Sequence, residues 1–372
     1  AKLLALAETG KSVRIGSAPD GERDGADVWL STEKLRDVVA FEPDDLYITV
    51  AAGMLLADVH TFLAEHGLQT PLASPWAEAT VGGLVASNAN APLRMRYGGL
   101  RDNVLCATVA MARGHVIRAG RPLVKNVAGY DLAKLFVGSQ GTLGLLCDVT
   151  LKLTPLPRAR RTLAVPVATQ ARGLAMASEA LRHALAASAV VLVEGAAVPM
   201  LAGSPFVLLY TAEGLIEDVE TELAAVSEAV RKAGAPLAIE IEETGLDAWK
   251  DFINSTTGDE LLVRIGVPAK SLSSYLDATK PDEATSLCTD CASGLIYARV
   301  TPKDKDDASA IMDSLRRPAL DHDGYAVVLP SNSRWTGIDP WGYRPSGLGI
   351  MQQLKARWDP SGVLNPGGFI AE

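Results

Sequence analysis

KNVAGYDLAKLFVGSQGTLG, residues 125–144, contains four glycines within an otherwise apolar segment whose other residues favour helix. Glycine has no Cβ and adopts backbone conformations that other residues avoid. The backbone here is therefore predicted to turn sharply and to pass close to a group that a side chain would obstruct. A bound ligand fits this pattern best.

A second glycine cluster lies upstream, in ATVGGLVASN, residues 79–88. It combines small hydroxyl side chains with the adjacent Gly82 and Gly83. Backbone N–H groups at such a turn can face an anion such as a pyrophosphate. A lone glycine pair more often marks a simple turn, so this pair gains weight only together with other motifs.

The size and composition of the chain indicate a folded protein of two domains. Its 372 residues exceed the about 250–300 that one hydrophobic core usually serves. A net charge of −9 disfavours nucleic acid or an anionic lipid surface as a partner. We expect a cytoplasmic protein, because no apolar run approaches the about 20 residues of a membrane span and the start of the sequence lacks a secretory signal. Four scattered cysteines agree with a reducing compartment.

The arrangement of residues predicts three regions of an α+β protein. Residues 1–157 contain short strands (12–15, 46–50, 108–111) and a helix (55–66) between glycine-rich turns, and they end at two prolines. In residues 158–330 the predicted strands and helices alternate regularly, which is typical of βαβ-type units around one antiparallel sheet. We expect residues 331–372, which contain half of the tryptophans, to dock back on the first region.

The elements expected in the middle region have the following bounds. Strands are predicted at 162–167, 190–194, 206–211, 237–242, 260–267, 294–300 and 325–329. Helices are predicted at 171–187, 217–233, 271–278 and 304–315.

Four segments in this order resemble the FAD-binding (PCMH-type) domain of the vanillyl-alcohol oxidase flavoprotein superfamily: residues 71–105, 124–146, 150–157 and 352–368. Within that superfamily they are most similar to the FAD-binding E subunits of bacterial glycolate oxidases. The resemblance implies a two-subdomain domain that holds FAD, covered by an antiparallel-sheet cap domain.

The resemblance also implies which residues bind FAD. It assigns two phosphate loops, an RYGxxRD-like segment, a loop under the isoalloxazine ring and an NPG turn near the flavin edge. The matching residues are Gly16, Ser17, Thr80, Gly82, Gly83, Ser87, Gly98, Asp102, Gly141, Thr142, Leu143, Gly144 and Asn365.

The sequence departs from the family at several of these motifs. The first phosphate loop, RIGSAPDG, has fewer glycines, and Gln140 replaces a frequent glutamate. D-2-Hydroxyacid dehydrogenases of the family bind a metal through an HxGDGNxH-like stretch in the cap domain, but here the matching residues 288–300 read CTDCASGLIYARV. We therefore predict no metal site and assign no catalytic base.

Other polar residues are candidates for a functional role. Cys288 and Cys291 suggest redox or metal chemistry, but two thiols three apart in a strand would point to opposite faces, which favours a structural role. Arg264 and Arg299 lie in cap strands, where an arginine can bind a carboxylate, although a cross-strand role is commoner. His60 and His66 fit a surface helix better than a ligand set. Tyr130 and Asp131 suit either the flavin border or packing.

These observations predict an FAD-dependent oxidoreductase component. The first hypothesis is an FAD-carrying subunit of a glycolate oxidase complex, which passes electrons together with a catalytic flavoprotein subunit and an iron–sulfur subunit, either free in the cytoplasm or held at the inner membrane by its partners. The alternatives are an independent FAD-dependent 2-hydroxyacid oxidoreductase and a non-catalytic scaffold that binds little flavin.

Overall fold

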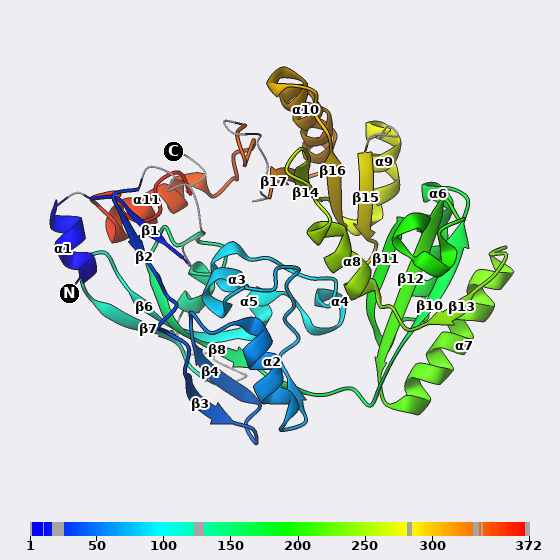
Figure 1. Cartoon of the computed structure of the whole chain (residues 1–372), viewed down its shortest axis with the longest axis horizontal. Helices are drawn as coiled ribbons and strands as arrows, with labels where there is room; N and C mark the ends of the chain where they lie inside the picture. Colours follow the sequence, from blue (N-terminus) through cyan, green and yellow to red (C-terminus); the bar gives the residue numbers. More distant parts are fainter. Residues whose placement is uncertain are drawn as a thin grey trace. The chain divides into compact units, whose positions relative to one another are not determined.

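The computed structural model describes residues 2–9, 11–16, 26–122, 130–280, 285–329, 335 and 338–368. It divides into two compact units (Figure 1). Unit 1 comprises residues 1–90, 98–156 and 344–372, and unit 2 comprises residues 91–97 and 157–343. The predicted site residue Ser17 and the first five residues of the 125–144 segment lie outside the described residues.

Unit 1 contains a five-stranded antiparallel sheet in the described residues, with the strand order β3-β4-β8-β6-β7. The strands are β3 (Val38–Glu42), β4 (Tyr47–Ala51), β6 (Val104–Ala110), β7 (Val116–Gly120) and β8 (Leu145–Lys152). Helices α2 (Leu56–Ala64) and α3 (Val81–Ser87) share an apolar core with this sheet. The core includes fully buried side chains such as Ile48, Val149 and Phe136.

The two ends of unit 1 meet beside this sheet. Strand β1 (Val13–Ile15) pairs in parallel with β2 (Val28–Leu30) and forms a bridge to Leu364. Helix α11 (Leu348–Trp358) precedes that C-terminal contact, and Trp358 stacks on Phe136 with ring centroids 5.6 Å apart. The smaller elements of unit 1 are α1 (Lys2–Thr9), β5 (Leu68–Gln69), α5 (Leu100–Asn103), the 3-10 turn η1 (Leu132–Leu135) and β9 (Thr154–Pro155).

Unit 2 contains one antiparallel sheet of eight strands in its described part, with the order β13-β10-β12-β11-β15-β16-β14-β17. The strands are β10 (Ala159–Val167), β11 (Ala187–Glu194), β12 (Phe206–Gly214), β13 (Ile239–Ile241), β14 (Leu261–Gly266), β15 (Thr285–Asp290), β16 (Leu295–Val300) and β17 (Tyr325–Val328). This topology confirms the predicted α+β class and the predicted antiparallel sheet.

The sheet of unit 2 is built from two βαββαβ halves with the same internal strand order. When the strands of each half are numbered along the chain, they lie side by side in the order fourth, first, third, second. The second strand of the first half, β11, pairs with the second strand of the other half, β15, at Leu192 and Thr289. Helices α6 (Gln170–Leu181) and α7 (Ile216–Lys232) cover the first half, and α9 (Leu272–Thr279) and α10 (Lys305–Asp321) cover the second. Residues of the opposite face contact α4 (Arg94–Tyr97) and α8 (Gly245–Asn254).

Unit 2 differs from the prediction in several elements. Strand β15 was not among the predicted strands, and α10 continues to Asp321 instead of ending at 315. Two further differences involve local contacts. The helix predicted at 171–187 ends at Leu181, because the buried carboxylate of Glu222 accepts the N–H groups of Leu185 (2.7 Å) and Ala186 (2.5 Å), and β11 then begins at Ala187. Helix α8 was not predicted, although a local pattern marks its start. The Thr244 hydroxyl accepts from the Asp247 N–H and the Asp247 carboxylate from the Thr244 N–H, both at 3.1 Å, which is a capping box.

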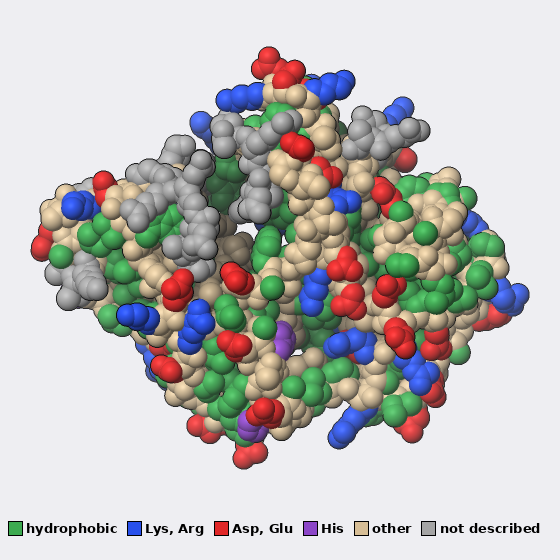
Figure 2. All heavy atoms as spheres, viewed as in Figure 1, with side chains coloured by type: hydrophobic (Ala, Val, Ile, Leu, Met, Phe, Trp, Pro, Cys, Tyr) green, Lys and Arg blue, Asp and Glu red, His purple; other side chains and the backbone are tan. Residues whose placement is uncertain are grey.

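Figure 2 shows acidic and basic side chains interspersed over the face that it draws, in keeping with the modest negative net charge. In the described residues, none of the helices is both long and apolar enough to cross a membrane.

Candidate cofactor site

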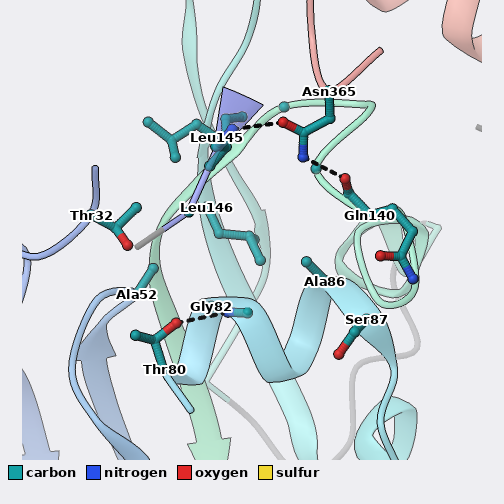
Figure 3. A pocket seen from close by; sticks show the side chains of 15 residues that line it. Thr32, Ala52, Thr80, Gly82, Ala86, Ser87, Gln140, Leu145, Leu146 and Asn365 are labelled. Carbon is teal, nitrogen blue, oxygen red and sulfur yellow. Dashed lines mark hydrogen bonds between the residues drawn. The ribbon is translucent and has the colours of Figure 1, made fainter. Parts of the chain in front are cut away.

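A cavity of about 170 Å³ lies in unit 1 and is lined by segments that are far apart in the sequence (Figure 3). Its walls come from β1, the segment after β2 at Thr32, the turn after β4, helix α3, the loop before β8, the start of β8 and the C-terminal segment. Most of the predicted cofactor residues meet here: Gly16, Thr80, Gly82, Gly83, Ser87, Gly141, Gly144 and Asn365.

Helix α3 forms one wall, and its glycines permit close packing. Thr80 caps the helix, and its hydroxyl accepts from the Gly83 N–H at 3.1 Å. A Cβ on Gly82 would lie 2.8 Å from the carbonyl oxygen of Ala52, which already accepts the Gly82 N–H at 2.7 Å. The donors of this first turn are thus engaged within the protein. The Thr80 hydroxyl keeps its own proton to donate.

The loop between η1 and β8 forms an adjoining wall. It turns sharply at Gln140 and Gly141, whose φ angles are +53° and +71°. The Gln140 N–H donates to the Ala86 carbonyl at 2.9 Å and the Gly138 N–H to the Val85 carbonyl at 3.0 Å, so the loop is fixed to α3. The sharp turn predicted from the glycines is confirmed at Gly141.

Asn365 closes the cavity from the C-terminal segment. Its side-chain oxygen accepts from the Ile15 N–H at 2.7 Å, and its amide nitrogen donates to the Gln140 carbonyl at 2.6 Å. A Cβ on Gly141 would lie 2.3 Å from that amide nitrogen. The group that Gly141 approaches closely is therefore Asn365, and both ends of the Asn365 amide serve to join β1 to the loop.

The remaining predicted residues lie outside the lining of this cavity. Thr142 and Leu143 are buried, with the Thr142 hydroxyl donating to the Ser139 carbonyl at 2.6 Å. Gly98 has a φ of +78°, and the Asp102 carboxylate accepts from the Gly99 N–H at 2.8 Å at the start of α5.

Several lining residues were not predicted: Ile15, Thr32, Ala52, Ala86, Leu145 and Leu146. Ile15 and Ala86 lie within the glycine segments 14–21 and 79–88 but are neither glycines nor hydroxyl residues. The other four lie outside those segments, so no local pattern marks them. Gly16, which was predicted, lines the cavity differently from Gly82. A Cβ built on Gly16 would have no heavy atom of the described residues within 4 Å, apart from its neighbours in the chain. A side chain at Gly16 would enter the open space.

The candidate residues of unit 2 divide between the two faces of its sheet. Cys288 is in register with Tyr297, which is in register with Arg264, and all three lie on the face opposite the four covering helices. Cys291 lies in the turn after β15, not in the strand as predicted, and packs in the core of the first half. Burial raises the pKa of both thiols, so neither is poised as a nucleophile.

Arg264 and Arg299 differ in their contacts. The Arg299 guanidinium donates to the Ser255 hydroxyl at 2.6 Å and lies 4.5 Å from the centre of the Phe252 ring. Arg264 lies 5.7 Å from the centre of the Tyr325 ring, and its buried Nε has no acceptor among the described residues. Arg264 is thus a half-buried cation without an ion-pair partner in the described part of the chain.

Three of the five histidines make local contacts in the structure. His66 and His322 lie within hydrogen-bond distance of helix carbonyls, Phe62 at 2.9 Å and Pro318 at 2.7 Å, respectively. His60 lies 3.0 Å from the Leu72 carbonyl. Across the residues that the structure describes, no three His, Cys, Asp or Glu side chains gather in a way that suits a metal ion.

Comparison with known proteins assigns the ligand of this fold. Residues 9–120 match the family model of the FAD binding domain, and residues 340–368 match that of the C-terminal domain of FAD linked oxidases. Residues 9–120 therefore form an FAD-binding domain, and the C-terminal match is to FAD linked oxidases. FAD is the cofactor of this chain.

Relatives span most of the chain at low identity. A D-lactate dehydrogenase of Anaerostipes hadrus is 26% identical over 399 residues, covering 96% of this chain and 83% of the relative. Glycolate oxidase subunit GlcD of Bacillus subtilis is 25% identical and covers 92% and 79%, respectively. Glycolate oxidase subunit GlcE of Escherichia coli is 38% identical over 137 residues, which are 36% of this chain and 39% of the relative.

A solved structure shares the fold. The alkyldihydroxyacetonephosphate synthase has a TM-score of 0.72 with this chain at 13% identity, over 98% of this chain and 73% of the synthase. At this identity the likeness supports the fold alone.

Proposed function

We propose that this chain is the FAD-carrying subunit of a glycolate or related 2-hydroxyacid oxidase complex, similar to the E subunits of bacterial glycolate oxidases. The observation that carries the proposal is the cavity in which Gly16, helix α3, the loop at Gly141 and the C-terminal Asn365 converge. The relatives named as glycolate oxidase subunits and D-lactate dehydrogenase support a 2-hydroxyacid as the substrate of the complex.

In this proposal FAD occupies the cavity of unit 1. When bound, FAD accepts the two electrons that leave the substrate. Gly16 would leave room for the cofactor, the Thr80 hydroxyl would donate a hydrogen bond to it, and the bonds of Asn365 would hold the loop at Gly141 in place.

The proposed partners are a catalytic flavoprotein subunit and an iron–sulfur subunit. A cubane or two-iron cluster needs about four protein ligands, usually thiolates. The four cysteines of this chain are divided, with Cys106 and Cys147 in unit 1 and Cys288 and Cys291 in unit 2. A cluster that removes electrons would therefore come from a partner, which would also provide any attachment to the inner membrane.

The guanidinium of Arg264, which has no ion-pair partner among the described residues, favours a second candidate, an independent FAD-dependent 2-hydroxyacid oxidoreductase. A half-buried arginine without a carboxylate partner can bind the carboxylate of a substrate through two parallel N–H donors. His322 does not serve as the base in such a site, because it packs on Tyr275 in the helix-covered core whereas Arg264 lies on the opposite face.

One experiment separates these candidates. The purified chain, loaded with FAD, is assayed with glycolate and D-lactate and an artificial electron acceptor, alone and with its copurified partners. The subunit proposal expects turnover only with the partners. Robust turnover by the single chain that Arg264→Gln abolishes would establish the independent enzyme. A purified chain without the visible absorbance of a flavin would instead favour the scaffold alternative.

A further inference from the structure

A buried ion pair lies directly behind the cavity in unit 1. Lys355 of α11 is 8% exposed, and its Nζ donates to the Asp359 carboxylate at 2.7 Å, the Leu364 carbonyl at 3.0 Å and the Thr142 carbonyl at 3.1 Å. An ammonium group has three N–H donors, so all of them are used. One side chain thus joins the C-terminal segment to the loop before β8.

The carboxylate of Asp359 completes this network. It is 2% exposed, and it accepts from the Val363 N–H at 3.2 Å and the Leu364 N–H at 2.9 Å. The turn between α11 and Leu364 is therefore closed by charge-assisted hydrogen bonds, which are stronger than those between neutral groups.

Each end of the network is one residue away from the cavity wall. Thr142 follows Gly141, and Leu364 precedes Asn365, so two of the three acceptors of Lys355 adjoin lining residues. Asn365 in turn holds Ile15 and Gln140. A displacement at Lys355 would move both sides of the cavity.

The energetics of buried ion pairs indicate what this network contributes. Replacing a buried pair by apolar residues of similar volume is often neutral or stabilising, because the desolvation of two charges offsets their attraction. Stability alone does not require this pair. Its hydrogen bonds, in contrast, fix three backbone segments in one geometry that an apolar pair would leave free.

We infer that Lys355 is a positioning residue for FAD, which sets the placement of Gly141 and Asn365 through its bonds to Thr142, Leu364 and Asp359. The inference rests on the proposed location of FAD in this cavity. It does not depend on the substrate or on partner subunits.

The test measures FAD affinity and folding stability separately. Apoprotein of the full chain is titrated with FAD by flavin fluorescence, and urea unfolding is followed by circular dichroism. We expect Lys355→Met to weaken FAD binding by at least about tenfold, since small misplacements of binding groups are costly. The double variant Lys355→Met/Asp359→Leu, which removes both charges, should regain stability but not FAD affinity, because the Thr142 and Leu364 carbonyls still lack their donor.

Glu222→Gln in unit 2 is the matched control. Glu222 is a buried carboxylate that accepts from two backbone N–H groups and from the Tyr210 hydroxyl, so its loss should lower stability and leave FAD affinity unchanged. Wild-type FAD affinity in Lys355→Met, or recovery of affinity together with stability in the double variant, would overturn the inference.

A second variant covers the case in which the double variant does not fold. Asn365 has a φ of +42°, which glycine adopts readily, so Asn365→Gly should keep the backbone while it removes the bonds to Ile15 and Gln140. We expect weakened FAD binding and an altered visible circular dichroism spectrum of the bound flavin. Unchanged values of both would contradict the positioning role. Loss of glycolate turnover with partners would bear on the proposed function and not on this result.

Discussion

The hydroxyl of Tyr97 donates to the carboxylate of Glu213, a residue 116 positions further along the chain. The Glu213 side chain is fully buried, and its second oxygen accepts from the Arg160 guanidinium at 2.6 Å. This contact attaches residues 91–97 to the rest of unit 2, although these residues follow helix α3 of unit 1 closely in sequence.

The first prediction concerns this contact. Tyr97→Phe leaves one oxygen of a buried carboxylate without its donor, so we expect the free energy of unfolding to fall by about 1–3 kcal/mol. Urea denaturation followed by circular dichroism measures the change. Tyr130→Phe, at a side chain that is 92% exposed, is the control and should change stability little. Equal stability of both variants would show that the Tyr97 bond contributes nothing.

The second prediction concerns the pH dependence of stability. Burial raises the pKa of Asp290 to about 6, against 3.8 for an ordinary aspartate. Between these values the folded state holds a proton that the unfolded state has lost. The free energy of unfolding should therefore fall as pH rises from about 4 to about 6. Above pH 6 the titration of Asp290 should cause no further fall. The full effect of Asp290 amounts to up to about 3 kcal/mol.

Asp290→Asn isolates this effect. Asparagine does not titrate, and its side-chain oxygen can still accept the Ala292 and Ser293 N–H groups, each 3.2 Å from the aspartate oxygen. Urea unfolding from pH 4 to pH 8 should show a smaller decline for the variant than for the wild type. Parallel curves for the two proteins would be the contrary result.

The third prediction is that FAD binds without a covalent bond. Covalent attachment requires a nucleophilic side chain such as His or Cys beside the flavin, and the described lining of the cavity contains neither. Acid precipitation of the purified protein should release the yellow colour into the supernatant. Flavin that stays with the pellet would show a covalent link.

The glycine loops and the sheet of unit 2 were predictable because their patterns are local. Gly141 marks a left-handed backbone turn, and the alternation of strands and helices gives the antiparallel sheet. The capping box at Thr244 was an equally local pattern that would have located α8.

The closure of the cavity was not predictable in the same way. Asn365 bonds to Ile15 across 350 positions, and Lys355 bonds to Thr142 across 213. Neither residue carries a pattern that names its partner, since the contact exists only after the C-terminal segment returns to unit 1. The proximity of Asn365 to the flavin edge, which the resemblance implies, stays a prediction, and the structure adds that its amide joins β1 to the loop.

The most direct test of the account is FAD binding by Gly16→Val. Gly16 lines the space proposed for FAD, and apart from its chain neighbours no described atom lies within 4 Å of the position of its Cβ. It does not have a left-handed φ, so the fold should be retained. We predict normal circular dichroism and FAD affinity at least about tenfold weaker, by flavin fluorescence titration. Gly203→Val, also at a glycine with open space and in unit 2, should bind FAD as the wild type does. Wild-type FAD affinity in Gly16→Val would contradict the assignment of this cavity.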